Sequence, residues 1–144
     1  MSASLAIFWI ASAAIGDETV AIDRDDRGVP HVFADTEEGA CFGMGCAQAE
    51  DRLEEILKQY RRAEGTMAEV FGPERLFADC RSRLWRHREV SEVRCGELSP
   101  KSRAMIEAYE DGIRACMKER PGEVPSFAME LRPWQAVALG RFII

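Results

Sequence analysis

The sequence predicts a mainly α-helical protein that opens with a β-hairpin. Two stretches, from Phe42 to Tyr60 and from Met105 to Cys116, carry apolar residues at spacings of three and four, as helices with one buried face do. Ahead of them, Val20 and Ile22 alternate with other side chains, as in a half-buried strand. With 144 residues the chain has room for one hydrophobic core and not for two.

The hairpin is predicted around a turn at residues 25–28, Asp-Asp-Arg-Gly, which are turn-forming residues. The segment 29–34 then forms the second extended stretch. Pro30 has no amide hydrogen to give to a neighbouring strand, so this strand should begin at a sheet edge. We interpret His31 within it as a packed or hydrogen-bonded structural residue rather than a general base.

The longest helix is predicted to begin after Thr36, a good N-cap residue, with two glutamates that suit the positive end of the helix dipole. It should end at Gly65, just after two arginines. The helix is therefore predicted to lie between Thr36 and Gly65.

Three glycines near the start of this helix need an explanation, because each costs a helix about 1 kcal/mol relative to alanine. Gly39, Gly43 and Gly45 lie within two turns, which predicts a bend or a close approach of another backbone. Further along, Asp51 and Arg52 are predicted to form an ion pair that positions the helix.

Later helices are separated by proline and glycine. They are predicted over residues 67–70 and 74–88, from Ser99-Pro100 to no further than Pro121, and, after a loop over residues 121–133, from Trp134 onward. The chain then stops at three apolar residues without a cap, so we expect the sequence to end inside an element.

The charge balance argues against a nucleic-acid partner. The formal net charge is -6, and the five arginines between residues 81 and 94 are interpreted as a solvated helix face rather than a phosphate-binding stripe. The five cysteines include no C-x-x-C pair, and we interpret them as small buried residues. A zinc site would need Cys41 and Cys46 with Cys80, Cys95 or His87, at spacings that no common zinc finger uses.

Residues 1–17 are predicted to be either a signal-like leader or an extra N-terminal segment. The apolar run over residues 5–16 is far shorter than the ~20 residues that span a bilayer. A small-x-small motif lies within the run at residues 11–13, but no Lys or Arg precedes the run. A leader would place the protein in the periplasm or outside the cell, whereas the odd number of cysteines without a leader would suit the cytoplasm.

Familiar catalytic patterns are missing from the sequence. It contains no G-x-S-x-G and no H-E-x-x-H, and its only histidines are His31 and His87. Gly43 and Gly45 resemble the start of a dinucleotide-binding loop, but Gln48 stands where the third small residue belongs. We therefore assign no catalytic, substrate-binding or metal-binding residue in this chain.

Three stretches together resemble the start of the penicillin-acylase family of N-terminal-nucleophile hydrolases. Residues 22–34, IDRDDRGVPHVFA, are similar to the family pattern I-x-R-D-x-x-G-x-P-H-I-x-A. Residues 42–53, FGMGCAQAEDRL, resemble G-x-G-x-A-Q-A-x-D-R-L, and RRAEGTMAEVFG follows in family order at 61–72. Further landmarks stand at sensible spacing at residues 98–100, 108–113 and 132–134. The order and spacing of these motifs are more specific than any one of them.

The resemblance implies an enzyme made as one precursor and cleaved into an α chain and a β chain. Its fold would be the αββα sandwich of this class, and residues 18–144 would be part of the α chain, truncated at the C-terminus. The nucleophile would be the serine at the start of the β chain, with its own α-amine as base. Substrates would be acylated small molecules of β-lactam, acyl-homoserine lactone or lipopeptide type. Many members bind a structural calcium, so the full-length enzyme is expected to hold one.

Within this chain the resemblance assigns structural roles. No serine follows a glycine at a processing site, and Ser2 leads into the apolar run without partners, so the chemistry should lie beyond residue 144. Arg24 and Asp25 would organise the hairpin, and Gly43 and Gly45 would allow close backbone approach. The alternative is a non-catalytic helical interaction module or a degenerate gene fragment.

Without its β chain, the 144-residue chain should have an incomplete core, poor solubility and affinity for hydrophobic dyes. We expect five apolar side chains to be left uncovered: Phe42, Leu53, Tyr109, Trp134 and Phe142.

Overall fold

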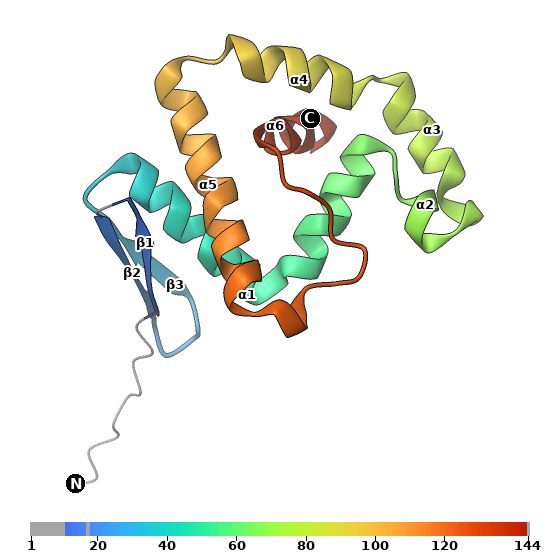
Figure 1. The fold of residues 1–144 in the computed structure, drawn as a ribbon. Coiled ribbons are helices and arrows are strands. Elements are labelled where there is room, and N and C mark those ends of the chain that lie inside the picture. Colours follow the sequence, from blue (N-terminus) through green and yellow to red (C-terminus); the bar gives the residue numbers. More distant parts are fainter. Residues whose placement is uncertain (1–10, 17, 144) are drawn as a thin grey trace, which may run out of the picture.

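The computed structural model describes residues 11–16 and 18–143, and these confirm a mainly helical fold with an N-terminal sheet (Figure 1). The strands are β1 (Ala11–Ile15), β2 (Glu18–Arg24) and β3 (Pro30–Phe33), joined in the antiparallel order β1-β2-β3. The helices are α1 (Glu37–Glu64), α2 (Ala68–Phe71), α3 (Leu76–Leu84), α4 (His87–Glu97), α5 (Pro100–Glu119) and α6 (Pro133–Ile143). Short 3₁₀ turns at Pro73–Arg75 and Pro121–Glu123 precede α3 and follow α5.

The predicted hairpin is formed by β2 and β3, with Arg24 opposite Pro30 and Ala21 opposite Phe33. The strand β1 adds to its other side, with Ala11 opposite Ile22. Ala11–Ile15 fall in the segment for which we proposed a leader or an added piece, while residues 1–10 and 17 lie outside the described residues. The strands bury Val20 and Ile22 on the side that meets α1.

The two ends of α1 form as predicted. Thr36 is the N-cap, and its hydroxyl oxygen accepts the Gly39 N–H at 2.9 Å. Gly65 ends the helix in the left-handed conformation, at φ 72°. The start of α1 is also tied to β2, because Glu18 Oε1 accepts the N–H groups of Asp35 and Thr36 at 2.6 and 3.0 Å. These bonds, and that from the Thr36 hydroxyl above all, lower the pKa of Glu18.

The glycines of α1 mark close approaches, as predicted. A Cβ on Gly45 would overlap the carbonyl oxygen of Tyr109 on α5, and one on Gly112 would overlap that of Phe42 on α1. A Cβ on Gly43 would collide with the side chain of Val32 on β3. The backbones of α1 and α5 therefore touch, and the main core lies beside this crossing. Its buried members are Ile22, Cys46, Ala47, Ala49, Leu53, Leu57, Tyr60, Ile113, Cys116 and Leu131.

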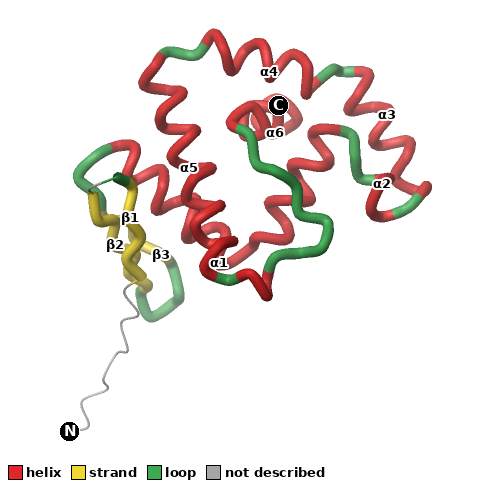
Figure 2. The backbone as a smooth tube through the Cα atoms, in the orientation of Figure 1, coloured by secondary structure: helices red, strands yellow, loops and turns green. Residues whose placement is uncertain are grey.

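The C-terminal helix closes the far side of this core. Figure 1 shows α6 within the frame formed by α1, α4 and α5. In Figure 2 the loop between α5 and α6 runs past α1 to reach it. Arg61 on α1 holds that loop, because its Nε and Nη2 donate to the Phe127 carbonyl at 3.1 and 2.8 Å.

The single helix that we predicted over residues 74–88 is wrong. The structure has two helices there, α3 and α4, separated at Trp85 and Arg86. Arg86 adopts φ 52° and ψ 42°, the left-handed conformation, which turns the chain between them. No proline or glycine marks this break, so the sequence pattern gave no sign of it.

The expected exposure of apolar residues is partly wrong. Phe42 and Leu53 are buried, because the sheet and α5 already cover α1, whereas Tyr109, Trp134 and Phe142 are half-buried. The large uncovered side chains lie elsewhere, mainly on α3, α4 and the segment between them. The cysteine prediction holds for Cys46 and Cys116, but Cys80 is exposed. In the described part of the chain, no helix is long and apolar enough to cross a membrane.

The α1–α5 contact predicts a large effect of one methyl group. Gly45→Ala should destabilise the fold by about 1–3 kcal/mol, because the added Cβ must push the two backbones apart. Gly96→Ala, in α4 with open space around it, is the matched control and should be neutral or stabilising by up to ~1 kcal/mol. Urea unfolding midpoints measure both; equal midpoints for the two variants would contradict the close approach.

Candidate functional site

The hairpin turn is organised by the carboxylate of Asp25. Its Oδ1 accepts the backbone N–H groups of Arg27 and Val29, both at 2.9 Å, and these bonds lower the pKa of Asp25. The Gly28 N–H closes the turn by donating to the Asp25 carbonyl at 2.8 Å. His31 Nε2 lies 3.7 Å from Asp25 Oδ2. His31 is thus paired with the turn, in an exposed rather than a packed position.

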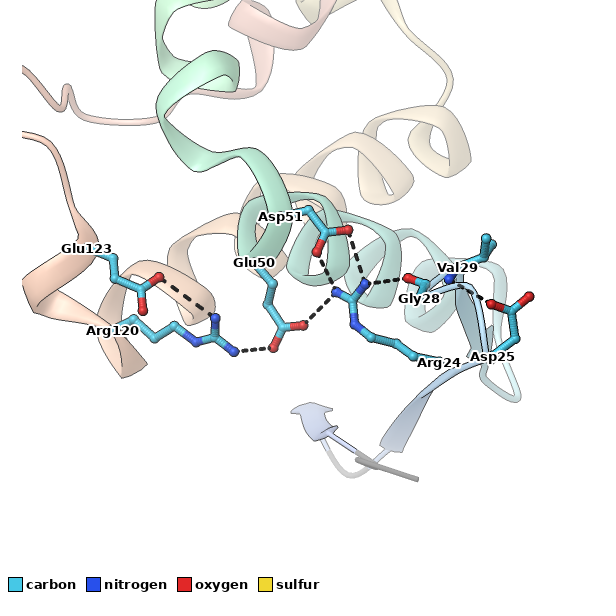
Figure 3. Close-up of polar contacts among 8 residues, drawn as sticks. All are labelled: Arg24, Asp25, Gly28, Val29, Glu50, Asp51, Arg120 and Glu123. Carbon is cyan, nitrogen blue, oxygen red and sulfur yellow. Dashed lines mark hydrogen bonds and ion pairs between the residues drawn. The ribbon is translucent and has the colours of Figure 1, made fainter. Parts of the chain in front are cut away.

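Arg24, directly before this turn, ties the hairpin to α1 (Figure 3). Its Nη1 donates to the Gly28 carbonyl at 2.9 Å and to Asp51 Oδ2 at 3.1 Å. Its Nη2 lies 2.9 Å from Asp51 Oδ1 and 3.1 Å from Glu50 Oε2. Two parallel bonds to one carboxylate fix the orientation of the guanidinium, and the bond to Asp51 is the main reason that the pKa of Arg24 is raised.

Glu50 carries this network on to the end of α5. Its Oε1 accepts Arg120 Nη2 at 2.9 Å, and Arg120 Nη1 lies 3.8 Å from Glu123 in the turn that follows α5 (Figure 3). The Glu50 side chain is only 13% exposed and lies between two guanidiniums. A buried carboxylate needs hydrogen bonds in place of those from water, and the guanidiniums donate them. One carboxylate therefore joins the hairpin, α1 and α5.

The predicted ion pair between Asp51 and Arg52 is wrong: the ion pairs of the described residues do not include it. Asp51 pairs with Arg24 instead, and Arg52 is exposed. Neighbouring residues on a helix do not face each other, so one of the two must point elsewhere. Arg52 also has φ -149° and ψ 38°, outside the helical region, which bends α1 where the hairpin is attached.

A second polar contact is buried between α1 and α5. The Tyr60 hydroxyl donates to Glu110 Oε1 at 2.7 Å, and both side chains are inaccessible to solvent or nearly so. The other oxygen, Oε2, is buried and has no hydrogen-bond partner. Burial raises the pKa of Glu110 to about 7, while the Tyr60 bond and the charge of Arg114 oppose that rise. Burial and the same carboxylate also raise the pKa of Tyr60.

Comparison with known proteins decides the family. A model of the penicillin amidase family matches residues 19–143. The chain belongs to the penicillin amidase family. The matched residues include the hairpin, the glycine-bearing helix start and α5, whose motifs predicted this family.

Similar proteins of the family are much longer than this chain. It is 30% identical to penicillin G acylase of Escherichia coli over 119 residues, which cover 80% of this chain and 14% of that protein. It is 29% identical over 108 residues to the acyl-homoserine lactone acylase QuiP of Pseudomonas aeruginosa, covering 75% of this chain and 13% of that protein. The penicillin acylase 2 proenzyme of a Pseudomonas species is 30% identical over 119 residues, which cover 81% of this chain and 15% of that protein.

The fold agrees with a solved member of the penicillin amidase family. A thermostable penicillin G acylase from Alcaligenes faecalis superposes with a TM-score of 0.74 at 31% identity, over 85% of this chain and 70% of the compared chain. The helices and the N-terminal sheet are therefore arranged as in a penicillin acylase chain.

The network around Arg24 is suited to holding this family fold together. Its carboxylates already accept from guanidiniums or backbone N–H groups. Among the described residues, no group of three or more His, Cys, Asp or Glu side chains is placed so that it could hold a metal ion. A structural calcium in the full-length enzyme stays a prediction that concerns other residues.

Sequence reasoning found some members of the network and missed others. Arg24 and Asp25 were predicted at the hairpin, and the structure places them there. Glu50 and Arg120 were missed, because a charged residue on a helix is expected to face solvent and no short motif links positions 70 residues apart. Glu110 was missed for the same reason.

The Arg24 network predicts a measurable coupling energy. A double-mutant cycle on Arg24→Ala and Asp51→Ala should give about 1–2 kcal/mol, because the pair is bidentate and part of a larger network. The exposed Arg94–Glu97 pair on α4 is the control and should give below ~0.5 kcal/mol. Urea unfolding of the seven proteins supplies both values, and equal couplings would show that Arg24 does not anchor the hairpin.

The buried carboxyl of Glu110 predicts that stability falls as the pH rises. Its pKa is about 7 in the folded protein and ordinarily 4.5, so the unfolded chain loses this proton first. Stability is fully present below pH 4.5 and decreases up to pH 7, by on the order of 3 kcal/mol. Glu110→Gln should remove this part of the pH dependence in urea unfolding between pH 4.5 and 8. An unchanged slope would show that Glu110 does not bind the proton.

Proposed function

We propose that this chain is the N-terminal portion of the α chain of an amidohydrolase that cleaves the linear amide bond of an acylated small molecule. The observation that carries the proposal is the family match over residues 19–143. The similarity to penicillin G acylase in sequence and in fold supports it. The name of one relative, a proenzyme, supports a precursor that is processed into an α and a β chain.

The nucleophile in this proposal is the serine at the N-terminus of the β chain, outside these 144 residues. Its hydroxyl oxygen attacks the amide carbonyl while its own α-amine takes the proton, and backbone N–H and an asparagine side chain hold the oxyanion. The amine product leaves with a proton, and water hydrolyses the remaining acyl ester. The described residues contribute none of these groups: they hold the hairpin, α1 and α5 in the arrangement on which the β chain folds.

The substrate class rests on the bond that the relatives' substrates share. Relatives are named as penicillin acylases and as acyl-homoserine lactone acylases. In both kinds of substrate an acyl group is joined to a cyclic amine component through a linear amide, and we include lipopeptide acyl amides on the same ground. We propose a periplasmic or secreted enzyme if residues 1–17 are a leader, and a cytoplasmic one if they are not.

Activity measurements on the full gene product test the proposal. The polypeptide encoded from residue 1 onward should release amine from penicillin G or an N-acyl-homoserine lactone, detected with fluorescamine. Replacing the serine at its processing point by alanine should abolish both chain cleavage and hydrolysis. The 144-residue chain alone should show no hydrolysis above the buffer rate.

Two results would contradict it. Hydrolysis by the 144-residue chain alone would mean that the chemistry lies within it. No hydrolysis of any acyl amide by the full gene product, together with cooperative, high-melting unfolding of the monomeric chain, would favour the non-catalytic helical module.

A further inference from the structure

The helix α3 turns polar side chains toward the interior of the protein and apolar side chains toward solvent. Its polar residues Asp79 and Ser82 are 3% and 4% exposed, while Phe77 and Leu84 are 82% and 79% exposed. Phe77, Cys80 and Leu84 are three and four residues apart, so they lie along one face of the helix. A helix on the surface of a protein normally does the opposite, because its apolar face packs against the core.

Hydrogen bonds explain how α3 is held in this orientation. The Asp79 carboxylate accepts the N–H of Met67 at 3.0 Å and that of Ala68 at 2.6 Å, at the start of α2. Arg83 Nε donates to the Gly65 carbonyl at 2.7 Å. The polar side of α3 therefore caps the turn after α1, and this fixes its apolar side outward.

The exposed apolar side continues beyond α3. Trp85, which follows it, is 65% exposed, and Val93 on α4 is 63% exposed, while α4 buries Ser91 completely. Trp85 also lines a groove of about 580 Å³ together with Arg81, Ser82, His87, Arg141 and Phe142. We call the surface formed by Phe77, Cys80, Leu84, Trp85 and this groove the α3–α4 face.

The groove is cationic and contains one buried nitrogen without a hydrogen-bond partner. Arg81 and Arg141 are exposed and form none of the ion pairs found among the described residues. The Nδ1 atom of His87 is buried without a hydrogen-bond partner. The pKa of His87 is lowered by burial and by the charge of Arg141, so it adds hydrogen-bonding capacity rather than charge.

We propose that the α3–α4 face docks an acidic segment with apolar side chains from the part of the same precursor that follows residue 144. Phe77, Leu84 and Trp85 would be covered by its apolar residues, and Arg81 and Arg141 would receive its carboxylates. This inference rests on the proposed function, because it is the precursor that supplies the partner.

The length of the relatives and the charge of the face favour this occupant. The relatives are about seven times longer than the segment they share with this chain, so they provide a large partner surface from the same polypeptide. A second copy of this chain fits less well. A two-fold contact through this face would bring together two surfaces that both carry the positive charges of Arg81 and Arg141, which is repulsive.

The exposed thiol of Cys80 reports directly on docking. In the full gene product, alkylation of Cys80 by iodoacetamide, followed by peptide mass spectrometry, should be at least ten-fold slower than in the same protein unfolded in urea. The double variant Phe77→Asp, Leu84→Asp and the double variant Arg81→Glu, Arg141→Glu should each bring the rate to within three-fold of the unfolded value. Because these side chains are exposed, the variants should keep the wild-type far-ultraviolet circular dichroism.

Matched controls separate docking from a general effect of added charge. Phe33→Asp changes an exposed aromatic residue on β3, and Arg27→Glu changes an exposed arginine in the hairpin turn. Both should leave Cys80 protected. Equal loss of protection in the controls and in the α3–α4 variants would overturn the assignment of the face.

Three further outcomes would overturn the proposal. The first is that Cys80 in the wild-type gene product reacts within three-fold of the unfolded rate. The second is that its protection disappears on dilution, as expected for a second copy. The third is that the gene encodes nothing after residue 144. Amide hydrolysis measured on the same sample keeps the two ideas apart. Hydrolysis with an open Cys80 refutes docking alone, and a protected Cys80 without hydrolysis refutes the proposed function alone.

Discussion

The backbone contact between α1 and α5 is the constraint on which most of the other interactions depend. Gly45 and Gly112 lie at the crossing, and neither position has room for a Cβ. Because the helices touch there, Tyr60 reaches Glu110 further along, and the end of α5 comes close enough for Arg120 to reach Glu50. A side chain at the crossing would push the two helices apart there, because a close-packed contact has no space for the added atoms. Two residues without side chains thus set the geometry of the polar contacts.

The two buried carboxylates near this crossing are accommodated in different ways. Glu50 accepts hydrogen bonds from two guanidiniums, and through them it joins the hairpin, α1 and the end of α5. Glu110 has a neutral hydroxyl as its partner and one oxygen with none, so burial favours its protonated form near neutral pH. The second arrangement makes the α1–α5 contact sensitive to pH.

The sequence predicted what depends on local chemistry. The Thr36 and Ser99 caps, the Gly65 terminus and the hairpin turn at Asp25 follow from residue types that serve those positions in any protein, and the structure confirms them. Contacts that depend on distant partners were missed, such as Glu50 with Arg120, or misassigned, such as Asp51 with Arg52. The break at Arg86 was missed because an arginine in the left-handed conformation carries no sequence signal. Burial of Phe42 and Leu53 was underestimated, because β2 and α5 cover α1 within the chain itself.

The exposed apolar side chains of α3 affect the free energy of association more than the free energy of folding. An exposed Phe77 or Leu84 costs the folding of this chain little, because both are exposed in the unfolded state as well. Their burial becomes favourable only when a partner covers them, by roughly 1.5–3 kcal/mol for each side chain before the costs of association. The bonds from Asp79 and Arg83 to the turn after α1 are what make this arrangement hold, since without them α3 could rotate and bury its own apolar stripe. The hydrogen bonds of its polar side therefore hold α3 with its apolar side exposed, and in the docking proposal this is the surface that another part of the protein would cover.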